Sequence, residues 1–360
     1  MARRVTINRR DKFISQEKVL SLLQQFINDS VSGRRTKSNG TRIGKGTITN
    51  YEYFNSNMIG FLNSKTKEFR IYNSSRLNHR ETERAKKHYQ DFYRAFTAYL
   101  YDDKNCFDNY VGLNIKCLRS FFNYLANELN YPVGTFHKSF YVPVELIPIV
   151  VLTPEQLRYF ISDPEMNRIA KENNLEVIKD IFVFGCAVAL RISDLMHLDK
   201  SNLIRKDGNY YINVKSIKTK TFTSIKLPEY CIEILEKYAG KHKTLLPQFS
   251  KGYFNLKLKE LASLIPDNYV MVKKRERRGK EVVVYKDKDR KEHYRLSDHI
   301  TAHTMRRTAI TTMLNFGMQE HMVRKISGHS PNSKEFFRYV ELSQSYLDSE
   351  TDRVFNKIVG

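Results

Sequence analysis

The spacing of hydrophobic residues predicts a helical N-terminal region. Apolar residues recur every three or four positions in three early stretches. These stretches lie at about 16–29, from Thr47 onward, and at about 83–101. A fourth and clearer stripe runs from Val111 to Leu129 and leaves Lys116 and Arg119 outside it. We therefore expect an all-helical domain at 16–135, preceded by a basic segment at 1–15.

Prolines interrupt this pattern between Tyr131 and Pro154 and predict an extended linker, which we place at 136–153. A helix restarts at Thr153, because a threonine cap is followed by proline and, three residues after the cap, by a glutamine. We expect a second domain at 154–360, ending in a tail at 347–360.

The second domain has mixed patterning. A helix is expected at about 174–188, and β-branched and aromatic runs at 210–214 and 221–227 predict strands. Another β-rich stretch, 269–285, contains a strongly basic run. The segment from 300 onward is helical, with breaks at two glycines. The fold class is therefore mainly α with a small β-sheet: an all-helical N-terminal domain and a mixed α/β second domain.

Charge narrows the function. The 360 residues include 61 Lys and Arg against 39 Asp and Glu, a net charge of +22. The excess positive side chains repel one another unless the protein usually binds a polyanion. We therefore expect nucleic acid as the partner, ahead of membrane surfaces and ribosomes. The composition excludes collagen-like and disordered chains.

Other features favour a cytoplasmic protein with no membrane partner. No run approaches the ~18 apolar residues of a membrane span, and no apolar stretch follows the basic N-terminus as in a secretory signal. The four cysteines lie far apart and form neither a zinc motif nor a disulfide framework, so we expect buried free thiols.

A few polar clusters stand out as candidate chemistry. Arg191 follows an apolar helix, and His303 and Arg306 share one helical face at three-residue spacing. His329 follows Gly328, and Tyr339 lies ten residues later. Each cluster alone is typical of ordinary surface or core residues.

In this order the clusters resemble the tyrosine recombinase (phage integrase) family over roughly 150–350. The resemblance implies a core-DNA-binding (SAM-like) domain at 16–135 and a recombinase catalytic domain at 154–360. The run from Gly328 to Phe336, G-H-S-P-N-S-K-x-F, resembles integrases of mobile elements in Bacteroides-type bacteria.

The resemblance also implies the roles of single residues. Arg191 and Arg306 would bind the scissile phosphate, His303 and His329 match the family's two histidine positions, and Tyr339 matches the nucleophile. Lys218 matches the hairpin lysine that protonates the leaving oxygen, with Lys220 two residues away as the alternative. Tyr346 is the nearby competitor for the nucleophile, and Asp194 is expected to orient a basic neighbour.

These residue types suit phosphodiester cleavage for general reasons. Guanidinium groups offer planar, permanently charged forks to phosphate oxygens, and a tyrosine needs its proton withdrawn before it attacks. Cationic side chains then perform the role of a metal, so we expect no cofactor and no ATP. The function implied is a site-specific recombinase that integrates or excises a mobile element through a 3′-phosphotyrosine.

Double-stranded DNA is the expected partner, with accessory DNA-bending proteins and a nucleoid-associated location. Candidate DNA-binding residues come from the basic segments. They are Arg34, Arg35, Lys45, Lys116, Arg119, Lys220, Lys273, Lys274 and Arg275. Apolar residues in the tail at 347–360 predict docking on a neighbouring copy and a homotetramer on DNA.

Three other functions fit parts of this pattern. A type IB topoisomerase uses the same residue types, although the helical N-terminal domain and the Gly-His motif favour the recombinase. A non-catalytic DNA-binding regulator would leave Tyr339 as a core residue. A metal-dependent nuclease or transposase ranks last, because no convincing carboxylate triad is visible in a β-sheet setting.

Overall fold

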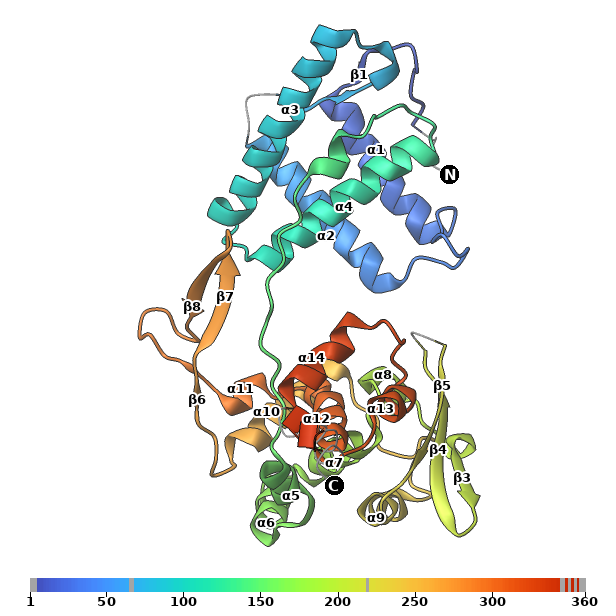
Figure 1. Cartoon of the computed structure of the whole chain (residues 1–360), viewed down its shortest axis with the longest axis vertical. Coiled ribbons are helices and arrows are strands. Elements are labelled where there is room, and N and C mark those ends of the chain that lie inside the picture. Colours follow the sequence, from blue (N-terminus) through green and yellow to red (C-terminus); the bar gives the residue numbers. More distant parts are fainter. Residues whose placement is uncertain are drawn as a thin grey trace. The chain divides into compact units, whose positions relative to one another are not determined.

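The computed structural model describes residues 5–64, 68–217, 220–343, 347–348, 351–352 and 355. By its contacts the chain divides into two units. The first, which we call the helical unit, is Met1–Ile147 with Lys274–Val284. The second, the mixed unit, is Pro148–Lys273 with Tyr285–Gly360. Figure 1 shows their elements.

The helical unit is built on four long helices, as the apolar spacing predicted. They are α1 (Gln16–Ser32), α2 (Lys45–Asn63), α3 (His79–Ala98), which continues as a π-helical turn (Tyr99–Asp103), and α4 (Asp108–Asn127). Aromatic rings fill the space between them; Phe26, Phe96 and Phe122 are fully buried. Burial of these rings is the main source of the unit's stability.

The unit differs from the prediction in detail. Helix α2 begins after Gly44, so Thr47 lies inside it. Helix α3 begins earlier than expected, because Asn78 and Glu81 form a capping box. The unit is not all-helical: strands β1 (Phe13–Ile14) and β2 (Ile71–Tyr72) pair antiparallel.

Short 3₁₀ turns complete the helical unit before the chain leaves it. They lie at Ser74–Arg76 and Phe136–Ser139. Strands β7 (Lys273–Arg277) and β8 (Lys280–Val284) pair as a hairpin, whose residues from Lys274 onward belong to this unit. The hairpin comes from the predicted β-rich stretch, but its place in the helical unit was not predicted.

The mixed unit surrounds the apolar helix α7. Its helices are α5 (Pro154–Ser162), α6 (Pro164–Glu172), α7 (Glu176–Val188), α8 (Ile192–Leu195), α9 (Glu229–Tyr238), α10 (Lys251–Ser263), α11 (Leu296–His299), α12 (Ala302–Asn315), α13 (Glu320–Ser327) and α14 (Lys334–Leu342). The capping box expected at Thr153 and Gln156 is present, and breaks follow at Gly317 and Gly328.

The strands of this unit form one small sheet and one short pair. Strands β3 (Leu203–Lys206), β4 (Asn209–Lys215) and β5 (Phe222–Lys226) are antiparallel in that order, after a 3₁₀ turn at Lys200–Asn202. Strands β6 (Val270–Met271) and β9 (Tyr294–Arg295) pair with each other. Only β4 and β5 were predicted as separate strands; β3 is amphipathic and partly exposed, which weakens its signal.

A close helix crossing fixes the centre of the mixed unit. A Cβ at Gly185 of α7 would lie 2.5 Å from Sδ and 3.1 Å from Cβ of Met305 in α12. Only glycine allows this approach. This close crossing places the end of α7 beside α12. Arg191 follows the end of α7, and α12 carries His303 and Arg306.

No helix in the described part of the chain combines the length and the apolar character that a membrane crossing requires. Of the four cysteines, which are all free, Cys117, Cys186 and Cys231 are buried and Cys106 is partly exposed.

Candidate functional site

Arg191 lies just beyond a sharp end to helix α7. Ala189 ends that helix in left-handed backbone, with φ of 54°. Such a conformation is costly for a residue with a Cβ and needs support from its surroundings. Part of that support comes from Arg306, whose NH1 group donates a hydrogen bond of 2.9 Å to the Ala189 carbonyl. Arg306 therefore stabilises the turn that positions Arg191.

A buried polar chain connects Arg191 to the β4–β5 loop. Arg191 NH1 donates to Ser216 Oγ at 3.3 Å, and Ser216 Oγ donates to Asp194 Oδ2 at 2.9 Å. The other carboxylate oxygen of Asp194 accepts from the backbone N–H of Ile217 at 3.0 Å. Asp194 thus holds the chain at Ser216 and Ile217, just after β4, and the expectation that it orients a basic neighbour is met at Arg191 through Ser216.

His329 lies against Arg306. The NH2 group of Arg306 is 3.1 Å from Nε2 and 3.3 Å from Nδ1 of His329, and Ser327 Oγ is 2.8 Å from Nδ1. Gly328, with φ of 63°, ends α13 and turns the chain so that the ring reaches this position. Burial, followed by Arg306 and Arg191, lowers the pKa of His329 to about 3. The ring is therefore neutral at pH 7.

Tyr339 lies in α14 and is only 2% exposed. Its ring centroid is 5.9 Å from that of His329 and 6.3 Å from that of Phe336. Burial and then Glu335 raise the pKa of the phenol, while Arg307 and Arg306 act in the opposite direction. Tyr339 and the candidate arginines thus occupy one unit of the same chain.

His303 lies in the first turn of α12, one turn before Arg306. Its backbone N–H donates to the Thr301 hydroxyl at 3.3 Å, and the ring is exposed. Partial desolvation, followed by Lys251 and Arg307, lowers its pKa. The three-residue spacing read from the sequence therefore places both side chains on one side of α12.

Two cationic groups sit close together in this site. Burial is the main reason that the pKa of Arg306 is lowered to about 10, and the charge of Arg191 is the second. Among the described residues, the hydrogen bonds from these two guanidinium groups go to uncharged partners, which are the Ala189 carbonyl, the Ser216 hydroxyl and the His329 ring. Such a pair is suited to an anion with several oxygen atoms, such as a phosphate.

Of the two candidate lysines, the structure describes only Lys220. Lys218 lies outside the described residues. Lys220 is exposed in the β4–β5 loop, with φ of 60° and its backbone N–H on the Ser216 carbonyl at 2.9 Å.

Six of the nine predicted DNA-binding residues have partners within the fold. Arg35 pairs with Glu128 at 3.2 Å and lies over the Phe26 ring. Arg119 donates to the carbonyls of Lys138 and Phe140. Arg275 pairs with Glu145 at 2.6 Å.

Three more of these residues contact other side chains, and the last three are exposed. Arg34 pairs with Asp29 at 2.6 Å with half its side chain exposed, Lys274 pairs with Glu281 at 2.8 Å, and Lys273 lies over the Tyr294 ring. Three are exposed residues: Lys45, Lys116 and Lys220. Their contact with DNA stays a prediction.

The sequence comparison decides the family. Residues 151–345, more than half of the chain, match the Phage integrase family. The chain belongs to this family. It is a tyrosine recombinase, an enzyme that exchanges DNA strands. No curated protein matches the chain closely enough to be reported.

Solved structures of recombinases share the fold of this family member. A lambda integrase tetramer bound to a Holliday junction matches with a TM-score of 0.57 and 12% identity, over 89% of this chain and 79% of that one. The Tn1549 transposon integrase with transposon right end DNA matches at 0.55 and 15%, over 93% and 98%. XerH bound to palindromic difH matches at 0.53 and 11%, over 94% and 96%.

Sequence reasoning missed the uncharged residues that hold the recombinase site together. Ser216, Ser327 and the Ala189 carbonyl have no pattern that distinguishes them from ordinary residues. Ser216 stands two residues before Lys218 and next to the end of a strand, which is the one signal that could have drawn attention to it. Within the described ranges, no three His, Cys, Asp or Glu side chains gather to hold a metal ion.

The lowered pKa of His329 predicts how this residue titrates. The unfolded chain, with a histidine pKa of about 6.5, binds this proton more readily than the folded chain. Neutral His329 therefore makes its full stabilising contribution to the free energy of unfolding above about pH 6.5. This contribution is lost as the pH falls toward about 3. The imidazole NMR signal of His329 is identified as the one that disappears in His329→Asn. In the wild-type protein we expect this signal to show no titration above pH 5. A midpoint near 6.5 would contradict this environment.

Proposed function

We propose that Arg191, Lys218, His303, Arg306, His329 and Tyr339 carry out DNA cleavage and rejoining through a 3′-phosphotyrosine. The observation that carries this proposal is the packing of Tyr339 against His329, which in turn contacts Arg306. A nucleophile, a neutral histidine and a buried cation thus meet in one unit. This arrangement is what attack on a phosphodiester requires.

The two arginines bind the scissile phosphate. Their guanidinium groups hydrogen-bond to its non-bridging oxygens and stabilise the negative charge that grows there in the transition state. Arg306 is pre-positioned by the Ala189 carbonyl, and Arg191 by Ser216. His303, beside Arg306 on α12, donates a hydrogen bond to the same phosphate.

Tyr339 attacks phosphorus from its phenolic oxygen. The phenol proton passes to His329, whose neutral ring lies against the tyrosine. A phosphate bound between the arginines raises the affinity of His329 for that proton, because it adds nearby negative charge. The Tyr339 Oη–P bond forms while the bond to the 5′ oxygen breaks.

The leaving 5′ oxygen takes a proton from Lys218. Ile217, the residue before Lys218 in the sequence, has its backbone N–H held by Asp194. Rejoining is the reverse of cleavage: a 5′ hydroxyl attacks the phosphotyrosine and Tyr339 leaves. The phosphotyrosine keeps the bond energy, so the reaction uses no ATP.

The substrate of the enzyme is a pair of specific double-stranded DNA sites, and the biological outcome is integration or excision of a mobile element. The solved lambda integrase structures contain core-site DNA or a Holliday junction, and the Tn1549 structures contain circular intermediate or transposon end DNA. The Gly328 to Phe336 run supports an element of the Bacteroides type. Exposed Lys45, Lys116 and Lys220 are the first candidates for phosphate contacts.

The active assembly is a homotetramer on DNA, located at the nucleoid and assisted by DNA-bending proteins. The lambda integrase tetramer supports this stoichiometry. The tail at 347–360 would join neighbouring copies. Most of its apolar residues lie outside the described residues; Phe355 is exposed.

Replacing the proposed nucleophile tests this function. We expect Tyr339→Phe to abolish a covalent protein–DNA band on a denaturing gel, with labelled DNA from either side of the gene and EDTA present. DNA binding on a native gel should persist, because the phenol contributes little to affinity. Tyr253→Phe, at an exposed tyrosine of α10, is the matched control and should keep the band. A band retained by Tyr339→Phe and lost in Tyr346→Phe would move the nucleophile.

A second experiment distinguishes Lys218 from Lys220 as general acid. Lys218→Ala should slow cleavage of ordinary DNA by about 10²–10⁴-fold. DNA in which sulfur replaces the leaving 5′ oxygen should restore the rate, because a thiol is a much stronger acid than an alcohol and leaves unprotonated. Lys220→Ala should show no such rescue. The opposite pattern would assign the role to Lys220.

A further inference from the structure

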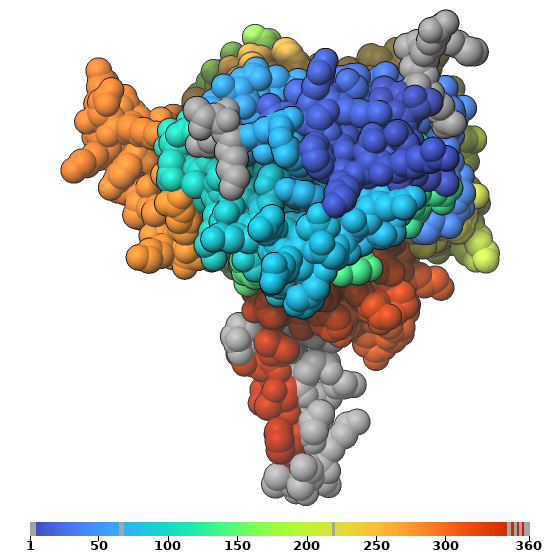
Figure 2. Space-filling view, turned by 90° about the horizontal axis from the view of Figure 1, so that it is seen from above, coloured from blue at the N-terminus to red at the C-terminus, as the bar shows by residue number. Residues whose placement is uncertain are grey.

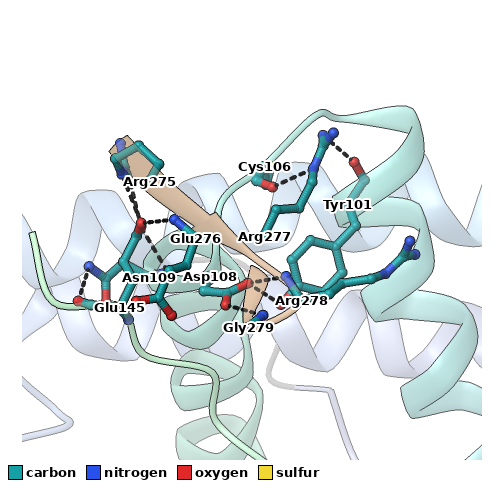
Figure 3. A network of polar contacts seen from close by, with 10 residues as sticks. All are labelled: Tyr101, Cys106, Asp108, Asn109, Glu145, Arg275, Glu276, Arg277, Arg278 and Gly279. Carbon is teal, nitrogen blue, oxygen red and sulfur yellow. Dashed lines mark hydrogen bonds and ion pairs between the residues drawn. The ribbon is translucent and has the colours of Figure 1, made fainter. Parts of the chain in front are cut away.

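The β7–β8 hairpin belongs to the helical unit although its sequence lies within the mixed unit. The chain passes between the units after Ile147, after Lys273 and again after Val284. Figures 1 and 2 show the hairpin, in orange, beside the teal end of the helical unit. The contacts that hold it there are polar and specific (Figure 3).

Glu145 is the first anchor of the hairpin. Its carboxylate accepts two hydrogen bonds from Arg275, at 2.9 Å from Nε and 2.6 Å from NH2, and one from the backbone N–H of Glu276 at 2.7 Å. The backbone N–H of Asn109, at the start of α4, is 3.4 Å away on the other side. Glu145 is 4% exposed, so a bidentate arginine is the partner that such a buried charge requires.

Asp108 is the second anchor, and it binds the tip of the hairpin. One carboxylate oxygen accepts from the backbone N–H of Arg278 at 2.7 Å and the other from that of Gly279 at 2.8 Å. Both turn residues have positive φ, 54° and 68°. This turn points two successive N–H groups at one carboxylate. Asp108 also accepts from the Tyr101 hydroxyl at 2.7 Å and is 3% exposed.

Arginine side chains complete the attachment. Arg277 donates to the Tyr101 carbonyl at 2.7 Å and to Asn105 Oδ1 at 3.0 Å. Arg278 pairs with Asp102 at 2.7 Å and lies over the Tyr101 ring. The carbonyl used by Arg277 lies in the π-helical turn after α3, where the regular helix pattern is interrupted.

We propose that the hairpin at 274–284 is an intramolecular clip that fastens the two units of the recombinase to each other. Its socket consists of Glu145, Asp108 and the carbonyl groups near Tyr101. Because the hairpin is anchored in the helical unit, three chain segments join the units instead of one. The arginines of the basic run therefore hold the protein together, and the run is not primarily a grip on phosphates.

The burial of the two carboxylates argues that the socket stays occupied. Removing the hairpin would leave Glu145 without its bidentate arginine and Asp108 without both turn N–H groups. Leaving such buried charges unpaired strongly destabilises the folded chain. The clip is therefore a permanent part of the folded chain, with its own hairpin as the occupant.

A charge swap across the anchor tests the clip in protein without DNA. Glu145→Arg and Arg275→Glu each place like charges together. We expect each variant to speed amide hydrogen exchange of the hairpin peptide by about tenfold or more, because charged hydrogen bonds are lost. The double variant should restore slow exchange. The control reverses the Lys274–Glu281 pair, 2.8 Å apart and exposed on the hairpin itself, and should leave exchange unchanged.

Mixing the two single variants separates a clip within one chain from exchange between chains. A clip within one chain predicts that the mixture stays fast, since each protein has like charges at its own anchor. Slow exchange in the mixture would overturn the proposal in favour of hairpins swapped between copies. The proposal would also be overturned if the hairpin peptide in either single variant exchanged its amide hydrogens as slowly as in the wild-type protein. If Glu145→Arg does not fold, Glu145→Gln and Arg275→Gln test the same anchor.

The consequence for DNA rests on the recombinase function and is measured separately. Opening the clip should weaken binding to a full core site and leave the rate of covalent complex formation at saturating protein nearly unchanged. Because hydrogen exchange is read without DNA, a clip that fails and a recombinase assignment that fails give different results.

Discussion

The site depends on holding two guanidinium groups near each other inside a protein. Arg191 and Arg306 repel each other, and burial adds to the cost of the Arg306 charge, as its lowered pKa records. The structure offsets this cost with oriented neutral dipoles: a carbonyl at the strained end of α7, a serine hydroxyl fixed by Asp194 and a neutral imidazole. The proposed function assigns the missing negative charge to the phosphate of the substrate, which would direct binding energy to the reacting atoms.

The same constraint explains the two uncharged members of the site. With cations close by, His329 stays neutral, and burial favours the protonated form of Tyr339 by raising the pKa of its phenol. In the proposed mechanism, the arriving anion favours protonation of the histidine and, with it, release of the phenol proton.

The sequence predicted the helices well, because each buries one apolar face, as Val111 to Leu129 illustrates. It also singled out Arg306, His329 and Tyr339, which the structure brings together, although their catalytic roles stay a prediction. It did not reveal Ser216 or the Ala189 carbonyl, since common residues and backbone groups leave no pattern. Nor did it reveal that the basic hairpin joins the helical unit, because pairing between Arg275 and Glu145 spans 130 positions.

The central claim is that Tyr339 forms the covalent bond to DNA within this cationic site. The most direct measurement is to trap the covalent complex, digest its DNA and protein, and locate the nucleotide-bearing peptide by mass spectrometry. The account predicts a nucleotide attached through its 3′ phosphate to Tyr339. Attachment to Tyr346 or to any other residue, or a 5′ linkage, would contradict it.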